Sequence, residues 1–148
     1  MEIPNGEPSP EEIKTGADLT GANFSEADLF RANLSRATLN QTDLSGADLR
    51  EAVLSGADLR DADLSGATLF GVNVSGLSLR RTDLSAADLR GADLSNANLH
   101  GVILTDADLR EADLTEANLR GADLTAATVP KGALSEAYVS ESDGLHSE

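Results

Sequence analysis

The feature that most constrains this chain is a period of five. Every fifth residue from position 19 to position 139 is apolar, with no insertion or deletion in the run. That residue is Leu except at Phe24, Val74, Val129 and Val139. Two places before it stands a small residue, mostly Ala, and between the two stands Asp or Asn in most repeats. A fixed short period over most of a chain predicts a repeat architecture in which each unit packs on its neighbours.

An α-helix does not accommodate this pattern. At about 100° per residue, a step of five rotates each Leu by about 140° and scatters the leucines around the whole cylinder. In an extended segment, residues two apart point to the same side. We therefore expect Ala and Leu to point inward, Asp or Asn to point outward, and the two remaining residues to turn a corner, often with the help of Gly.

The corner residues predict how many sides make one turn of the coil. The residue after the apolar position is Ser or Thr in every second repeat from Ser25 to Ser135, and mostly Arg, Phe, Asn or His in the others. An alternation of ten residues requires an even number of sides in each coil. Four sides, which means twenty residues in a coil, satisfy this condition.

The runs that begin at Ala47 (ADLRE), Ala57 (ADLRD) and Ala92 (ADLSN) resemble the pentapeptide-repeat family, whose motif is A(D/N)LXX. The resemblance is to the type of protein abundant in cyanobacteria, and it implies an all-β right-handed quadrilateral β-helix, a solenoid with four pentapeptides in each coil. About six coils stacked at ~4.8 Å predict a rod ~30 Å long.

Three segments are expected. Residues 1–16 form an N-terminal segment in which a short capping helix over about 10–15 starts at a capping box, Ser9 to Glu12, and places Ile13 over the first coil. Residues 17–141 form the β-helix, and residues 142–148 form a mobile polar tail.

Composition excludes several classes of protein. The net charge of −15 argues against direct binding to nucleic acid or to an anionic membrane surface, and it permits a basic protein partner. No segment approaches the ~20 apolar residues of a membrane span. With no Cys and two His, we predict no metal site and no cofactor, and a filled rod offers no cleft for catalysis, so we do not expect an enzyme.

Assigning the repeats to four sides in turn gives a map of charge, with one side carrying acidic residues and no basic ones. Its members are the candidate partner-binding residues of the sequence: Asp43, Asp63, Asp83, Asp106 and Asp123. Asn occupies the same repeat position elsewhere, for example at Asn33 and Asn73, so at most positions we interpret the Asp/Asn oxygen as an acceptor for nearby backbone amides. The outward Phe30 and Phe70 lie on one face, two coils apart. One interpretation is that they anchor a partner; we favour the other, that they are isolated exposed apolar residues of an ordinary kind.

Two functions fit these observations. The first is a non-catalytic structural or protein-interaction scaffold, monomeric or weakly self-associating. The alternative follows from the resemblance, because some members of the family mimic B-form DNA and bind DNA gyrase; another basic nucleic-acid-binding protein would serve equally. The coils carry about one net charge per ~3 Å, against one per ~1.7 Å in duplex DNA. The N-terminus shows no signal segment, which predicts the cytoplasm by default, or the periplasm or thylakoid lumen if a signal has been removed.

Overall fold

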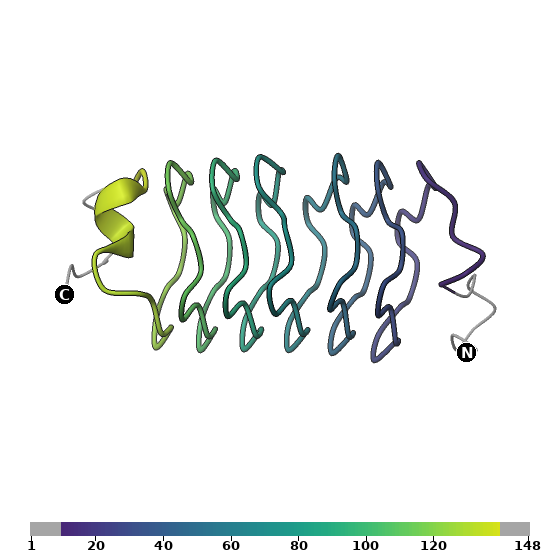
Figure 1. Cartoon of the computed structure of the whole chain (residues 1–148), viewed down its shortest axis with the longest axis horizontal. Coiled ribbons are helices and arrows are strands. Elements are labelled where there is room, and N and C mark those ends of the chain that lie inside the picture. Colours follow the sequence, from purple (N-terminus) through teal and green to yellow (C-terminus); the bar gives the residue numbers. More distant parts are fainter. Residues whose placement is uncertain (1–9, 140–148) are drawn as a thin grey trace.

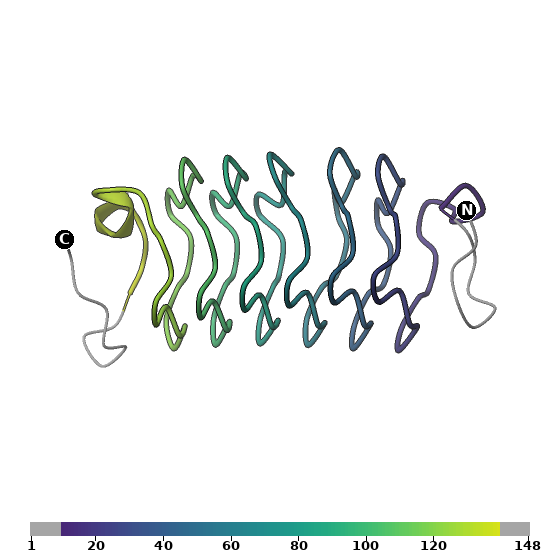
Figure 2. The same ribbon diagram turned by 90° about the horizontal axis from the view of Figure 1, so that it is seen from below.

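The computed structural model describes residues 10–139, which form a straight rod of stacked coils that begins at residue 10 at one end and reaches residue 139 at the other (Figures 1 and 2). Isolated parallel bridges join residues that lie twenty positions apart, such as Asp43 with Asp63 and Asp108 with Thr128. Twenty residues in each coil correspond to four sides of five residues. The predicted four-sided β-helix is therefore confirmed.

We call the sides A to D in chain order. Side A contains residues 17–19 and each segment twenty residues further on; side B starts with 22–24, side C with 27–29 and side D with 32–34. Within a repeat, the two residues that follow the inward Leu are its first and second corner residues. Residues at the same position of successive coils form a column along the rod.

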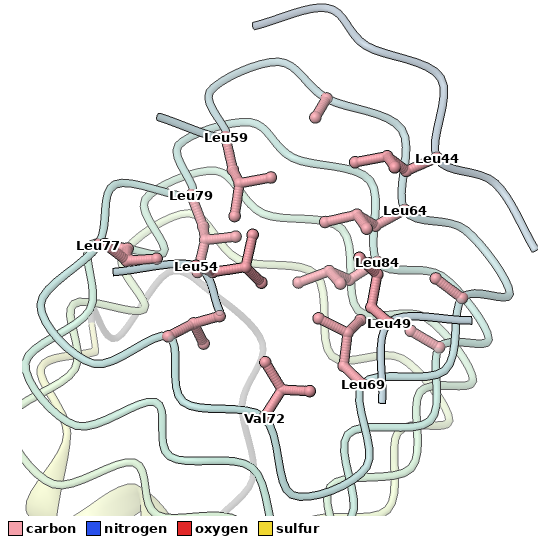
Figure 3. Close-up of a cluster of buried hydrophobic side chains, with 14 of the residues drawn as sticks. Leu44, Leu49, Leu54, Leu59, Leu64, Leu69, Val72, Leu77, Leu79 and Leu84 are labelled. Carbon is pink, nitrogen blue, oxygen red and sulfur yellow. The ribbon is translucent and has the colours of Figure 1, made fainter. Parts of the chain in front are cut away.

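The inward Leu and Ala columns form the core of the rod, and Figure 3 shows part of it. Leu39, Leu44 and Leu59 have no exposed surface, and the neighbouring Ala columns are buried with them. Thr42 and Thr82 replace Ala at two places, and their hydroxyl groups donate to the carbonyl oxygens of residues 19 and 59 at 2.8 and 2.7 Å. Because these hydroxyls are satisfied, they lie in the apolar interior without the penalty of an unpaired polar group.

Backbone hydrogen bonds hold the coils together. The amide at the Asp position donates to the preceding coil, as from Asp63 to the oxygen of Thr42 (3.0 Å), and the amide at the Leu position donates to the following coil, as from Leu64 to the oxygen of Asp83 (2.7 Å). The second corner residue also donates to the following coil, and the Ala amide closes a turn within its own coil. The amide of the first corner residue is left for a side chain to satisfy.

The corners do not depend on Gly as the sequence suggested. Each corner has two residues, and between positions 16 and 126 the second of them is always in the left-handed region, with φ between 57° and 79°. Many of these are not Gly, for example Glu26, Ala86 and Ala126. The inter-coil ladder imposes this conformation on residues that tolerate it only at a cost of about 1–2 kcal/mol.

Both ends of the rod differ from the prediction. Residues 10–12 form a turn, and the described part of the segment 10–15 contains no helix, although Ile13 is buried as expected (7% exposed). The amide of Gly16 already donates to the carbonyl oxygen of Ser35 in the next coil. The residues that remain before Gly16 are too few to nucleate a stable helix. Ser9, the expected N-cap, lies outside the described residues.

At the C-terminal end, the repeat around Leu134 does not form a fourth side. Its residues fold instead into the 3₁₀ helix η2 (Ala133–Glu136), which is preceded by Gly132 with φ of 79°. Pro130 occupies the preceding corner and has no amide hydrogen, so the usual corner cannot form there. The chain rejoins the ladder at Tyr138, which bridges to Asn118. The predicted tail 142–148 lies outside the described residues.

One stretch of the ladder is open, on side D near the middle of the rod, where Figure 1 shows a wider interval between coils. Within residues 10–139, this is the place where Val53 and Asn73 form no bridge and where the amides of Leu54 and Gly56 reach no backbone oxygen. A cavity of about 280 Å³ lies between the two coils. We attribute this side D opening to Leu77, because adjacent coils place Ala in its column and the larger side chain forces the coils apart.

Candidate interaction surfaces

Candidate sites lie on the outward columns, because the inward residues are apolar except for Thr42 and Thr82, whose hydroxyl groups are already hydrogen-bonded. Within residues 10–139 no group of three or more His, Cys, Asp or Glu side chains is arranged to hold a metal ion, and every buried side-chain nitrogen or oxygen has a hydrogen-bond partner. No helix in that part of the chain has the length and hydropathy to cross a membrane.

The structure stacks most of the sequence-predicted acidic residues along side B. Successive bridges join Asp43 to Asp63 and Asp63 to Asp83; Ile103 then interrupts the column, which ends at Asp123. We call these four aspartates the acidic column. Asp106 is a second corner residue with φ of 60°, so it lies at the edge of side B rather than in the column.

Each carboxylate in the acidic column is held by its own corner. Oδ1 of Asp43 accepts hydrogen bonds from the amide (3.0 Å) and the hydroxyl (2.6 Å) of Ser45, two residues later. Asn23 holds Ser25 in the same way with its amide oxygen. Since Asn and Asp share this arrangement, the oxygen satisfies the corner amide that the backbone ladder leaves over. The hydroxyl of Thr125 likewise holds the pKa of Asp123 below its ordinary value.

Side C carries a different surface, to which the sequence analysis assigned no binding role. Its first corner residues stack in the order Phe30, Arg50, Phe70, Arg90 and Arg110, and we call them the Phe–Arg column. Phe30 is 40% exposed and Phe70 is 52% exposed. The guanidinium of Arg50 lies 5.7 Å from the ring centre of Phe30, and that of Arg90 lies 5.3 Å from the ring centre of Phe70.

The arginines of this column are fixed by aspartates of their own repeats. Arg50 and Arg90 each donate through Nε and Nη2 to both oxygens of the carboxylate two residues earlier, Asp48 or Asp88, at 2.6–2.8 Å. Such two-point pairs fix the plane of the guanidinium. The same arrangement between Arg110 and Asp108 lowers the pKa of Asp108 to about 2.

Between the fixed arginines, the Phe–Arg column is hollowed. A shallow depression of about 490 Å³ is bordered by Phe70, Arg50 and Arg90. The two phenylalanines are therefore not isolated, as the sequence interpretation had them, because each forms a stacked group with a neighbouring arginine. The twenty-residue register already placed Phe30 and Phe70 on one face, and the contacts between the rings and the guanidinium groups come from the structure.

A protein-family model for pentapeptide repeats matches the chain in eight copies, over residues 15–46, 27–66, 67–106, 92–129 and 103–140. The chain belongs to the pentapeptide repeat family. This confirms the resemblance and the four-sided fold, and it agrees with the predicted class of function, a structural or interaction scaffold. No curated protein matches the chain.

Several solved structures are similar to this pentapeptide repeat protein. One is a pentapeptide repeat protein from the thylakoid lumen of Arabidopsis thaliana, 30% identical over 95% of this chain and 91% of that chain, with a TM-score of 0.49. HetL, involved in heterocyst differentiation regulation in the cyanobacterium Nostoc, is 33% identical over 85% of this chain and 66% of its own, with a TM-score of 0.44. QnrB1, a plasmid-mediated fluoroquinolone resistance protein, is 20% identical over 84% of this chain and 73% of its own, also with a TM-score of 0.44.

Proposed function

We propose that this protein is a non-catalytic scaffold that binds a protein partner through the Phe–Arg column of side C. The observation that carries the proposal is the pair of exposed aromatic rings, Phe30 and Phe70, held two coils apart on a rigid ladder and stacked with arginine. Aromatic residues, Phe included, and Arg are enriched at protein–protein interfaces. Because the backbone ladder already fixes these side chains, binding immobilises few additional groups.

The charge of side C supports a protein partner. Its arginines are neutralised by aspartates of their own repeats, such as Asp48 and Asp88, so the surface offers rings and flat ion pairs rather than free positive charge. A nucleic acid or an anionic membrane would meet a chain with a net charge of −15. A protein with an apolar ridge that fits the depression beside Phe70 would contact the rings and the neutral ion pairs, and it need not carry the negative charge of a nucleic acid or a membrane.

The filled interior supports a non-catalytic role. The described carboxylates lie on outward columns in contact with water, and no cleft separates two of them into an acid and a base of different pKa. Catalysis requires a site that excludes water from the reacting groups. The rod instead supplies fixed spacing between side chains, which suits recognition.

The test is capture of partners from a native lysate by the tagged full chain, followed by direct binding to the purified partner. The double variant Phe30→Ala and Phe70→Ala should weaken binding to that partner by about tenfold or more. Val53→Ala is a matched control, because Val53 is similarly exposed (48%) but lies on side D. If the double variant binds as tightly as the wild type, side C is not the interface.

A second candidate function, mimicry of DNA toward gyrase or another basic nucleic-acid-binding protein, is favoured by the acidic column. Its aspartates stack in register, and no basic residue lies on side B. A gyrase supercoiling assay tests it, with the fourfold Asp→Asn variant of the acidic column as the control. Asn preserves the corner hydrogen bonds, so the variant should fold and lose only charge. Inhibition by the wild type and not by the variant would support mimicry.

A further inference from the structure

A basic strip lies on side A of this acidic protein. The first corner residues of three successive coils are Arg80, His100 and Arg120, and bridges between residues 78, 98 and 118 hold their repeats in register. At ~4.8 Å for each coil, the strip extends about 10 Å along the rod. All three side chains point away from the filled interior, and all three are exposed.

The strip is not neutralised in the way that the other arginine columns are. Elsewhere an aspartate two residues earlier pairs with the arginine, as Asp58 does with Arg60 at 2.5 Å. In the strip, that position is uncharged in all three repeats: Ser78, Asn98 and Asn118. Within residues 10–139, neither Arg80 nor Arg120 forms an ion pair; Arg120 lies over the ring of Tyr138, 5.8 Å from its centre.

The neighbouring columns also leave the strip open. The second corner residues beside His100 and Arg120 are Gly101 and Gly121, so no side chain covers the strip there. Arg81, beside Arg80, is paired with Asp61 at 2.7 Å, and the Asp61 carboxylate also interacts electrostatically with Arg80, although it forms no ion pair with it. On side B, the Asp ladder is interrupted by Ile103 at the level of His100.

The side chains of the two Asn residues beside the strip accept hydrogen bonds from the backbone amides of its corners. Oδ1 of Asn98 accepts the amide of His100, and Oδ1 of Asn118 accepts the amide of Arg120, both at 3.2 Å. The corners are therefore built like those of the Asp repeats, but without a negative charge. The three positions at which an aspartate would neutralise the strip therefore carry no charge.

We propose that the strip binds a compact oxyanion of the pyrophosphate or triphosphate class, with the Arg80 and Arg120 guanidinium groups at its two ends and His100 between them. Guanidinium groups present several N–H donors in a planar fork that matches phosphate oxygens. The ligand must be short, because beyond the ~10 Å of the strip its remaining charges would meet a protein of net charge −15. Screening over ~8 Å at physiological salt keeps the attraction local.

This proposal does not depend on side C or on a protein partner. The shared chemistry is a run of two or three phosphates, which either a free inorganic polyphosphate or a phosphate ester supplies. Tripolyphosphate and a nucleoside triphosphate are the two probes. Equal affinities would assign the site to the phosphate chain alone, whereas tighter binding of the nucleotide would assign it to a phosphate ester.

The experiment is an NMR titration of the full chain with each probe at low ionic strength, following backbone amides and arginine Nε–H signals. We expect shifts concentrated at residues 80, 100 and 120. Arg80→Gln and Arg120→Gln should each weaken binding roughly tenfold. Arg110→Gln, which removes a paired arginine on side C, is the matched control and should leave the affinity unchanged.

A further variant tests the strip with both of its arginines left in place. Asn118→Asp installs the residue found at this position in most other repeats, so it should fold normally, and its carboxylate should pair with Arg120 and weaken binding. The proposal is overturned if neither probe, at a concentration of about 10 mM, shifts the NMR signals of residues 80, 100 and 120. It is also overturned if Arg110→Gln weakens binding as much as Arg120→Gln does.

Discussion

The amide of Ser65 donates to Oδ1 of Asp63 at 2.9 Å, and the hydroxyl of Ser65 donates to the same oxygen at 2.6 Å. The amide at this corner is the one that the backbone ladder does not use. The repeat therefore needs a short side chain with an oxygen at the Asp position, and it does not need a charge. This explains why Asp and Asn exchange along the rod.

Substitutions at Asp63 separate the oxygen from the charge. Asp63→Asn keeps the acceptor, so the free energy of unfolding should change by less than about 0.5 kcal/mol. Asp63→Ala leaves the Ser65 amide without its partner and should reduce the free energy of unfolding by about 1 kcal/mol. Chemical denaturation followed by circular dichroism measures both. Equal losses in the two variants would mean that the carboxylate acts through its charge.

Most of the architecture was predictable because one local rule repeats. The period of five indicated which side chains point inward, and the ten-residue alternation of corners led to four sides. The columns of Leu39 and Leu59 followed directly, as did the stacking of Asp43 and Asp63. Such long-range neighbours could be assigned because no insertion shifts the register.

The second corner residues give a matched pair on side B. Gly66 and Ala86 occupy the same column in adjacent coils, with φ of 67° and 57°. Ala86→Gly should stabilise the protein by up to about 1 kcal/mol, because Gly adopts this region without the steric penalty of a Cβ atom. Gly66→Ala should destabilise it by a similar amount, although its new Cβ would meet no atom within 4 Å. Thermal denaturation compares the two, and changes of the same sign would contradict the account.

The Arg110–Asp108 pair predicts a dependence on pH. The arginine lowers the pKa of Asp108 to about 2, below the ordinary value of 3.8, so the folded state favours the ionised carboxylate. The resulting stability is present above about pH 4 and is lost as the pH falls toward 2. Asp108→Asn should lower the melting temperature at pH 5 and little at pH 2.

Asp28→Asn provides the control for that experiment. Asp28 lies in the same column, but Phe30 stands where the arginine would be, and its carboxylate accepts the Phe30 amide. At pH 5 the melting temperature should fall less in Asp28→Asn than in Asp108→Asn, because within residues 10–139 no arginine forms an ion pair with Asp28. Equal losses at pH 5 in the two variants would show that the arginine pairing is not the source of the effect.

The side D opening predicts a local loss of protection from hydrogen exchange. The amides of Leu54, Gly56 and Asn73 have no backbone acceptor within residues 10–139, so they should exchange faster than the equivalent amides of adjacent coils. Leu77→Ala should let the coils close and slow the exchange. Val102→Ala is the control, because Val102 also replaces Ala in its column while the ladder beside it stays intact. Unchanged exchange in Leu77→Ala would show that another residue holds the coils apart.

The features that the sequence interpretation missed arise where packing overrides the local rule. Leu77 fits the pattern of apolar inward residues, and the sequence pattern does not show that its volume exceeds that of the alanines in its column beside the opening. The left-handed conformation at Ala86 is imposed by the coils above and below rather than by its own preference. At the C-terminal end, Leu134 keeps the period of five, yet Pro130 and Gly132 divert the chain into η2.

Every surface described above depends on residues twenty positions apart lying next to each other. The chain contains no Cys, so pairs of introduced cysteines test this directly by oxidation and mass spectrometry. Ser65→Cys combined with Ser85→Cys, twenty apart, should form an intramolecular disulfide, because neighbouring coils bring the Cα atoms to about 5 Å. Ser65→Cys combined with Arg80→Cys or Ser75→Cys, fifteen or ten apart, should not. A disulfide in the fifteen-residue pair, with none in the twenty-residue pair, would mean three sides in each coil and would contradict the account.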